Sequence, residues 1–239
     1  LKNVCSKTQT SDCKAQRCVK IASIECFMED ANSILCSGYG KARPLITDVY
    51  KTYDMSNLML ENTLIEGAYI LRPKIIGDHR GYLYESFNQK QFMGLTGLQI
   101  NFVQDNHSFS HRAVLRGLHY QYKKPQGKLI RVSRGEIYDV IVDLRENSKT
   151  YGNWFGMELS ALNQKQLWAP PGVAHGFLVL SDGADVLYKM TEYYDPEGEV
   201  CLDWNDPTVG IQWPLPAGVA PNINAKDAAG LSWDAIPKF

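Results

Sequence analysis

Residues 114–121 read Val114-Leu115-Arg116-Gly117-Leu118-His119-Tyr120-Gln121. If this stretch is a strand, alternation places Leu115, Gly117, His119 and Gln121 on one face and Val114, Arg116, Leu118 and Tyr120 on the other. A histidine and an amide then share a surface with a glycine, which would let a flat ligand approach the backbone. A Pro-Gln-Gly turn precedes Lys128 and predicts that the next strand folds alongside. We therefore expect a base and a cation at one pocket.

The chain around this stretch favours an all-β fold. From Met55 to Phe239, short apolar runs are separated by Gly, Pro, Asn and Asp, a pattern typical of a sandwich or barrel, jelly rolls included. The expected strands are residues 68–76, 82–87, 129–132, 137–144, 154–159, 166–169, 173–180 and 185–193. Helices are expected only at residues 89–95 and after Ala225.

Composition narrows the class of protein and of partner. The 239 residues are 44% hydrophobic, enough for a sizeable core in one large domain or two small ones. A net charge of -1 gives no reason to expect a nucleic-acid partner. We find no apolar run approaching about 18 residues and no secretory signal, so we expect no membrane association and a cytoplasmic location.

The first 54 residues differ from the rest. Their periodicity is weak, although residues 19–28 and 31–34 could form a short helix or strand. Met55-Ser56-Asn57 looks like an internal translation start, so we expect residues 1–54 to be a poorly ordered or artefactual extension and residues 55–239 to be the folded domain. Five of the six cysteines precede residue 37, without a Cys-x-x-Cys pair or a nearby histidine, and we expect no structural metal there.

His119 and His175 are the two histidines inside strand patterns. A metal site in a β-barrel needs three or four ligands, and neither histidine has a His-x-His neighbour or a glutamate that completes a set, so we expect no bound metal. Both could simply be packed core residues. As a general base, a histidine would need a carboxylate partner. Spacing leaves that partner open among Asp139, Asp143, Asp185 and Asp227.

Other residues could complete an acid-base site. Tyr188 could act as a general acid, although a tyrosine in a strand is more often a packing residue. Arg80, Arg116 and Arg131, together with Lys128, could hold a phosphate. Taken singly, each of these cations would be an ordinary surface charge.

Five motifs, taken together and in order, resemble the dTDP-4-dehydrorhamnose 3,5-epimerase family. They are Gly77-Asp78-His79-Arg80-Gly81-Tyr82-Leu83-Tyr84-Glu85-Ser86-Phe87, Phe102-Val103-Gln104-Asp105-Asn106-His107-Ser108, Leu115-Arg116-Gly117-Leu118-His119-Tyr120-Gln121, Gln126-Gly127-Lys128-Leu129-Ile130-Arg131-Val132 and Pro171-Gly172-Val173-Ala174-His175-Gly176-Phe177. The resemblance spans roughly residues 64–229. It implies a cupin-type jelly roll (double-stranded β-helix), a homodimer, no metal or other cofactor, and inversion at C3 and C5 of a dTDP-linked 4-keto-6-deoxyhexose in dTDP-L-rhamnose biosynthesis.

The resemblance also implies roles for individual residues. His119 would be the base, Asp227 its carboxylate partner, Lys128 the cation facing the sugar's C4 oxygen, and Tyr188 the acid on the opposite face. The substrate-binding set would be Gln104, Asn106, Arg116, His175 and Lys226, with Arg80 and Glu85 supplied across the dimer. One aromatic position of the family is Leu83 here, which would weaken or shift stacking on the nucleotide base.

Two other functions remain open at this point. A single-centre epimerase, acting at C3 or C5 of a related dTDP-4-keto-deoxysugar, would keep the same base. A non-catalytic jelly roll that binds sugar nucleotides would have no need of a paired acid and base, so the joint presence of His119, Asp227, Lys128 and Tyr188 argues against it.

Overall fold

The computed structural model describes residues 27–28, 34–35, 52–55, 57–215 and 218–239. The chain divides into two compact units, Leu1–Leu45 and Ile46–Phe239. In the first unit, the described residues form an antiparallel pair, β1 (Phe27–Met28) with β2 (Ile34–Leu35). The short elements expected at residues 19–28 and 31–34 lie mostly outside the described residues.

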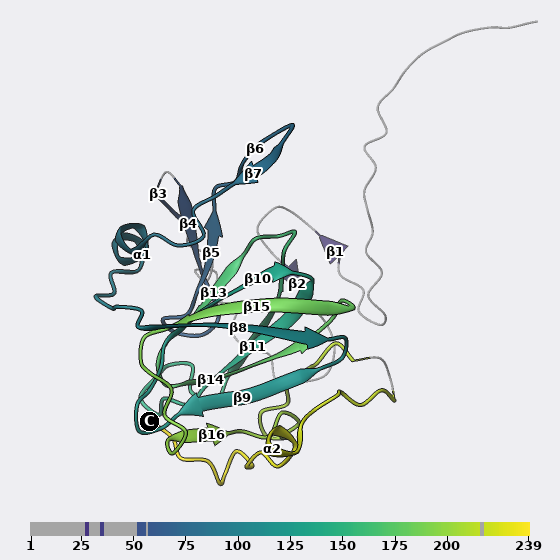
Figure 1. Ribbon diagram of the computed structural model, residues 1–239. Helices are drawn as coiled ribbons and strands as arrows, with labels where there is room; N and C mark the ends of the chain where they lie inside the picture. Colours follow the sequence, from purple (N-terminus) through teal and green to yellow (C-terminus); the bar gives the residue numbers. More distant parts are fainter. Residues whose placement is uncertain (1–26, 29–33, 36–51, 56, 216–217) are drawn as a thin grey trace, which may run out of the picture. The chain divides into compact units, whose positions relative to one another are not determined.

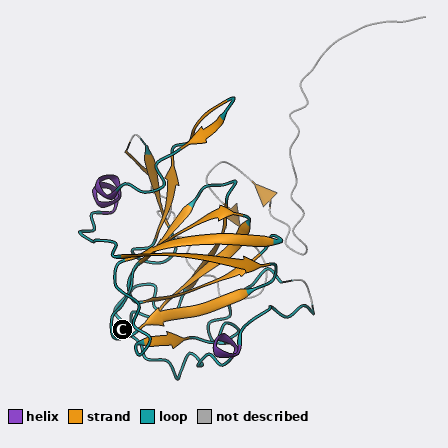
Figure 2. Ribbon diagram, in the orientation of Figure 1, coloured by secondary structure: helices purple, strands orange, loops and turns teal. Residues whose placement is uncertain are grey.

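Two large antiparallel sheets form most of the second unit (Figures 1 and 2). The seven-stranded sheet has the order β3-β4-β5-β13-β10-β15-β8. Its strands are β3 (Thr52–Met55), β4 (Leu58–Asn62), β5 (Tyr69–Pro73), β13 (Gln166–Ala169), β10 (Lys128–Arg134), β15 (Gly183–Met190) and β8 (Gln104–His111). The five-stranded sheet consists, in order, of β12 (Trp154–Ser160), β11 (Glu136–Asp143), β14 (Val173–Val179), β9 (Leu115–Gln121) and β16 (Glu199–Cys201). The predicted jelly roll is confirmed.

From β8 to β11, consecutive strands alternate between the two sheets, and this corrects one expectation. We expected the strand that begins at Lys128 to lie beside residues 114–121, but β10 pairs with β13 and β15 in the opposite sheet. The turn is held at the end of β15, because the Gly127 amide donates to Thr191 Oγ1 at 2.8 Å and the Thr191 amide donates to the Gly127 carbonyl. Lys128 therefore approaches His119 from the facing wall of the sandwich.

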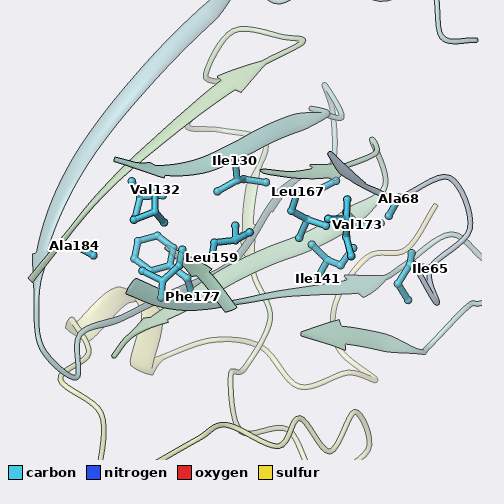
Figure 3. Packing of buried hydrophobic residues seen from close by; sticks show 14 of the residues in the cluster. Ile65, Ala68, Ile130, Val132, Ile141, Leu159, Leu167, Val173, Phe177 and Ala184 are labelled. Carbon is cyan, nitrogen blue, oxygen red and sulfur yellow. The ribbon is translucent and has the colours of Figure 1, made fainter. Parts of the chain in front are cut away.

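The main core fills the space between the sheets (Figure 3). Ile130 and Leu167 from one sheet pack in the same cluster as Ile141 and Phe177 from the other. Each such side chain contributes roughly 1.5–3 kcal/mol when fully buried. Because side chains alternate along β14, His175 shares the inner face with Phe177. The inner face around His175 is thus continuous with the apolar core.

Other parts of the second unit pack on part of the outer face of each sheet. On the five-stranded sheet, Leu118 and Tyr120 pack with residues of the C-terminal segment, including Trp213 and Trp233. This packing fixes the segment that carries α2 (Ala225–Ala228). On the seven-stranded sheet, α1 (Gln89–Thr96) inserts Phe92 against Trp168. Both expected helices are confirmed.

The sequence prediction identified the interior strands better than the edges. Strands expected from residue 129 to residue 193 are found within a few residues of their predicted bounds. The run 68–76 instead divides into β5 and the start of β6 (Ile76–Asp78), which forms an exposed hairpin with β7 (Gly81–Leu83). The polar edge strand β8 was missed.

The predicted domain boundary at Met55 stays a prediction. β3 begins at Thr52, inside the stretch assigned to the extension, and pairs with β4 in the seven-stranded sheet. Among the helices in the described ranges, none has the length and apolar character needed to cross a membrane.

Candidate active site

His119 and Asp227 form a close pair built from distant parts of the chain. His119 lies in β9 and Asp227 in α2, with 2.8 Å between Nε2 and Oδ1. The second carboxylate oxygen, Oδ2, accepts the Gly117 amide at 3.0 Å, and the Asn224 side chain caps the helix by accepting the Asp227 amide. Because a carboxylate only accepts hydrogen bonds, Nε2 must carry the proton and Nδ1 keeps a free lone pair.

The environment keeps Asp227 ionised. Burial raises the pKa of this carboxyl group, but the hydrogen bonds from His119 and the Gly117 amide outweigh burial, so the pKa lies below its usual value. The Asp227 side chain is 1% exposed, whereas that of His119 is 27% exposed. A buried, charged carboxylate behind a partly accessible imidazole can stabilise the imidazolium that forms on proton abstraction.

A bulge in β9 brings Arg116 and His119 to the same cavity, where strict alternation placed them on opposite faces. Opposite β14, His175 pairs with His119 and Phe177 with Arg116, so three steps along β9 match two along β14. The bulge contains Gly117, whose φ of +100° belongs to the region that favours glycine. The expected division of faces is therefore wrong across Gly117, because the extra residue reverses the alternation.

Lys128 supplies a cation from the facing sheet. It is buried, and its Nζ donates to the His119 carbonyl at 3.2 Å. Burial lowers the pKa of Lys128 to about 8, against the opposing attraction of Glu199 and Asp139. A lysine held in this way is protonated at neutral pH and can stabilise a developing oxyanion.

A cavity of about 340 Å³ lies between the two sheets and is lined by Arg116, His119 and Lys128. Tyr188 enters from β15, next to Asn106 of β8, its cross-strand partner. His175 and Phe177 enter from β14 on the other side. The imidazole of His119 thus comes from one wall of the cavity, whereas the phenol of Tyr188 and the ammonium group of Lys128 come from the other.

His175 has a carboxylate partner of its own. Its Nε2 lies 2.8 Å from Asp139 Oδ1, and both side chains are nearly inaccessible, at 8% and 0% exposure. Two other candidate carboxylates serve elsewhere: Asp143 binds Arg145, and Asp185 binds His107. Of the four aspartates, Asp227 is thus the one in contact with His119, and Asp139 is in contact with His175.

Comparison with known proteins identifies the family. Residues 62–235 match the family model described as dTDP-4-dehydrorhamnose 3,5-epimerase. The chain belongs to this family. Curated epimerases of that name from Pseudomonas aeruginosa and Salmonella typhimurium are 51% and 50% identical to it, over 71% and 72% of this chain and 92% and 93% of theirs. The Legionella pneumophila enzyme, solved with dTDP-4-keto-L-rhamnose, has a TM-score of 0.73 and 47% identity, covering 75% of this chain and 95% of that one.

Most of the site residues predicted for this epimerase family member lie together. The cavity is lined by Gln104, Asn106, Arg116, His119, Lys128, His175 and Tyr188, with Asp227 behind His119. Lys226 is exposed and forms an ion pair with Glu199, another cavity residue.

Arg80 and Glu85 lie outside this cavity. Arg80 is on the exposed β6–β7 hairpin and donates to Asp78. Glu85 accepts hydrogen bonds from Asn88 and Gln91 beside α1. The structure of the single chain therefore does not bring these two residues to the epimerase cavity.

Three residues at the site escaped the sequence analysis. Glu199 and Tyr194 line the cavity, and the Tyr194 hydroxyl donates to Glu199 at 3.0 Å. Cys201 lies opposite His119 on β16. Their stretch has no regular alternation. The three-residue edge strand β16 pairs with β9, and the Tyr194 amide donates to Gln104 Oε1 at 3.0 Å.

Proposed function

We propose that this chain inverts C3 and C5 of dTDP-4-dehydro-6-deoxy-D-glucose and so forms dTDP-4-dehydro-L-rhamnose, a step of dTDP-L-rhamnose biosynthesis. The observation that carries the proposal is the cavity in which the His119–Asp227 pair, Lys128 and Tyr188 meet. A non-catalytic protein that only binds sugar nucleotides would not need a base paired with a buried carboxylate. The family membership gives the proposal its substrate class.

The chemistry follows from the C4 ketone of the substrate. A proton on the carbon next to a carbonyl can be removed once the resulting enolate is stabilised. We assign His119 Nδ1 to take that proton, Asp227 to support the imidazolium, and Lys128 to bind the enolate oxygen. One well-placed donor to an oxyanion is worth on the order of 3 kcal/mol.

Inversion also needs an acid on the opposite face of the ring. A single base would tend to return the proton to the face from which it came. Tyr188 belongs to the seven-stranded sheet and His119 to the five-stranded sheet, so the two side chains approach the cavity from different walls. This placement supports Tyr188 as the proton donor, a role typically worth roughly 100-fold or more in rate.

Binding is proposed to depend on the nucleotide half of the substrate. Arg116 carries the only arginine side chain among the described residues that line this cavity, and it lies near Gln104 and Asn106, which can donate further hydrogen bonds. His175 and Lys226 complete the proposed binding set.

The proposed assembly is a cytoplasmic homodimer that needs no cofactor. Arg80 and Glu85 would act in the partner's site, which agrees with their position outside the cavity of their own chain. Sedimentation velocity on the full chain would measure the mass, and a monomer that turns over substrate at the full rate would contradict this assembly.

The deciding experiment is turnover of the dTDP-linked 4-keto sugar in heavy water, with deuterium counted at C3 and C5 by NMR. Deuterium at both carbons, with inversion at both, is the expected result. Label at one carbon alone would identify a single-centre epimerase, and no label would indicate a binding protein.

A further inference from the structure

Cys201 lies next to His119, the proposed base, and the proposed epimerisation chemistry does not use its thiol. It is the direct cross-strand partner of His119, since β16 pairs with β9. Side chains of such partners lie on the same face, a few ångströms apart. The thiol is free and half-buried, and its Sγ lies 3.9 Å from the Asp227 carbonyl oxygen. The nearest acceptors of the thiol are thus backbone carbonyls, which form only weak bonds with sulfur.

Three ligand atoms of types that bind zinc converge here. A ring nitrogen of His119, the sulfur of Cys201 and a carboxylate oxygen of Asp227 all lie within 4.8 Å of one another. Ligands of a tetrahedral zinc ion stand about 3.3–3.7 Å apart, given bonds of about 2.0 Å to nitrogen and 2.3 Å to sulfur. Small side-chain adjustments are therefore enough to close the three atoms around an ion, with the fourth position left to water.

We propose that His119, Cys201 and Asp227 form an inhibitory site for a soft divalent cation such as Zn²⁺. Cys201 is the residue that makes the site selective, because thiolate sulfur favours zinc over hard cations such as Mg²⁺. The effect on rate rests on the proposed role of His119, whereas the binding of the ion does not.

The proton balance explains why the ion would inhibit. A neutral imidazole carries one proton, which the contact with Asp227 places on Nε2. When Nε2 coordinates the cation, that proton must move to Nδ1, and the thiol proton of Cys201 is released to solvent. His119 then has no lone pair with which to accept a proton from the sugar. Substrate groups bound by Arg116 and Gln104 are untouched, so kcat should fall much more than KM rises.

The test uses the full chain in which Cys5, Cys13, Cys18, Cys26 and Cys36 are replaced by serine, so that Cys201 is the only thiol. Zn²⁺ should inhibit this protein reversibly, with recovery on chelation, whereas Mg²⁺ should not. Cys201→Ala and Cys201→Ser should each need roughly tenfold or more zinc for half-inhibition, judged against their own metal-free rates. Using both variants guards against one that folds poorly.

A second measurement is independent of catalysis. Co²⁺ added to the same protein should give a sulfur-to-metal charge-transfer band that is absent from both Cys201 variants. A band in a chain without epimerase activity would support the metal site and count against the proposed function. Unchanged zinc sensitivity in both variants, or a Co²⁺ spectrum without a sulfur band, would overturn the inference.

Discussion

His119 and His175 lie side by side as cross-strand partners on β9 and β14, and each is 2.8 Å from the carboxylate of its own aspartate. The two pairs differ in access, since the His119 side chain is 27% exposed and that of His175 is 8% exposed. A base must reach its substrate and then carry a charge, which favours the more accessible pair. In the buried pair the same proton placement leaves Nδ1 of His175 as a fixed hydrogen-bond acceptor at the cavity.

Removing the proposed base should abolish proton exchange as well as epimerisation. We expect His119→Ala to lose both completely, while Asp227→Asn keeps the imidazole without its charged support and retains a residue of about 0.01–1%. Deuterium incorporation and product configuration, measured by NMR, are the readouts. His107→Ala is the matched control, because His107 pairs with Asp185 outside the cavity. A His119→Ala protein that still exchanges at C5 would remove His119 from the role of base.

Removing the proposed acid should separate exchange from inversion. Tyr188→Phe keeps the base and the lysine, so the enolate can form and be reprotonated on its original face. We expect solvent deuterium to enter faster than inverted product appears. Tyr194→Phe is the informative comparison, since Tyr194 also lines the cavity but donates to Glu199. If Tyr194→Phe separates the two processes and Tyr188→Phe does not, the acid is Tyr194.

The rate should fall at alkaline pH because Lys128 loses its proton. The pKa of Lys128 is lowered to about 8, so the ammonium group is present below that pH and absent above it. We expect kcat/KM, which reports the free enzyme, to decline as pH rises through about 8. Lys128→Arg should move this limb to higher pH, because arginine stays charged. A limb at the same pH in Lys128→Arg would assign it to another group.

Arg116 should govern affinity more than turnover. Arg116→Ala should raise KM by roughly 10–100-fold, the loss expected for hydrogen bonds to a charged group, and a free 4-keto sugar should be a poor substrate for the parent chain. Steady-state kinetics on both substrates provide the measurement. Arg112→Ala is the control, because Arg112 binds Asp182 away from the cavity. Equal turnover of free and nucleotide-linked sugar would contradict this role.

The bulge in β9 should not tolerate a side chain at Gly117. A Cβ there would stand 2.6 Å from the His175 carbonyl oxygen and 2.8 Å from Gly176 Cα, in a backbone with a φ of +100°. We expect Gly117→Ala to lower the free energy of unfolding by about 2–4 kcal/mol. Gly97→Ala isolates the backbone cost, since Gly97 has a φ of +71° and open space around it. Denaturant unfolding of both variants tests this, and equal losses would show that the clash is relieved.

Local patterns in the sequence predicted elements well and their pairing poorly. The runs that became β11, β13 and β14 are recognisable in the sequence because strands buried on both faces consist largely of apolar residues. The crossing of Lys128 to the opposite sheet had no local signal, because it depends on hydrogen bonds between Gly127 and Thr191, far apart in sequence. The hydrophobic pattern alone does not specify which sheet a strand joins.

The site shows the same division. Strand alternation alone separated Arg116 from His119, because a one-residue bulge is invisible to a period of two. Spacing could not select Asp227, which is 108 residues from its partner in the sequence. The family resemblance, carried by several motifs in order, supplied that choice, and the contact between the two side chains agrees with it.

His119, the proposed base, gains its carboxylate partner only when the last part of the chain is in place. Asp227 is held by α2, and that segment joins the sandwich through the bridges of Val114 with Asn222 and of Leu202 with Leu231. The same late segment packs Trp233 and Ile236 in one cluster with Leu118 of β9. A product cut short before Asn224 would thus lose the carboxylate beside His119 together with part of the cover of the five-stranded sheet.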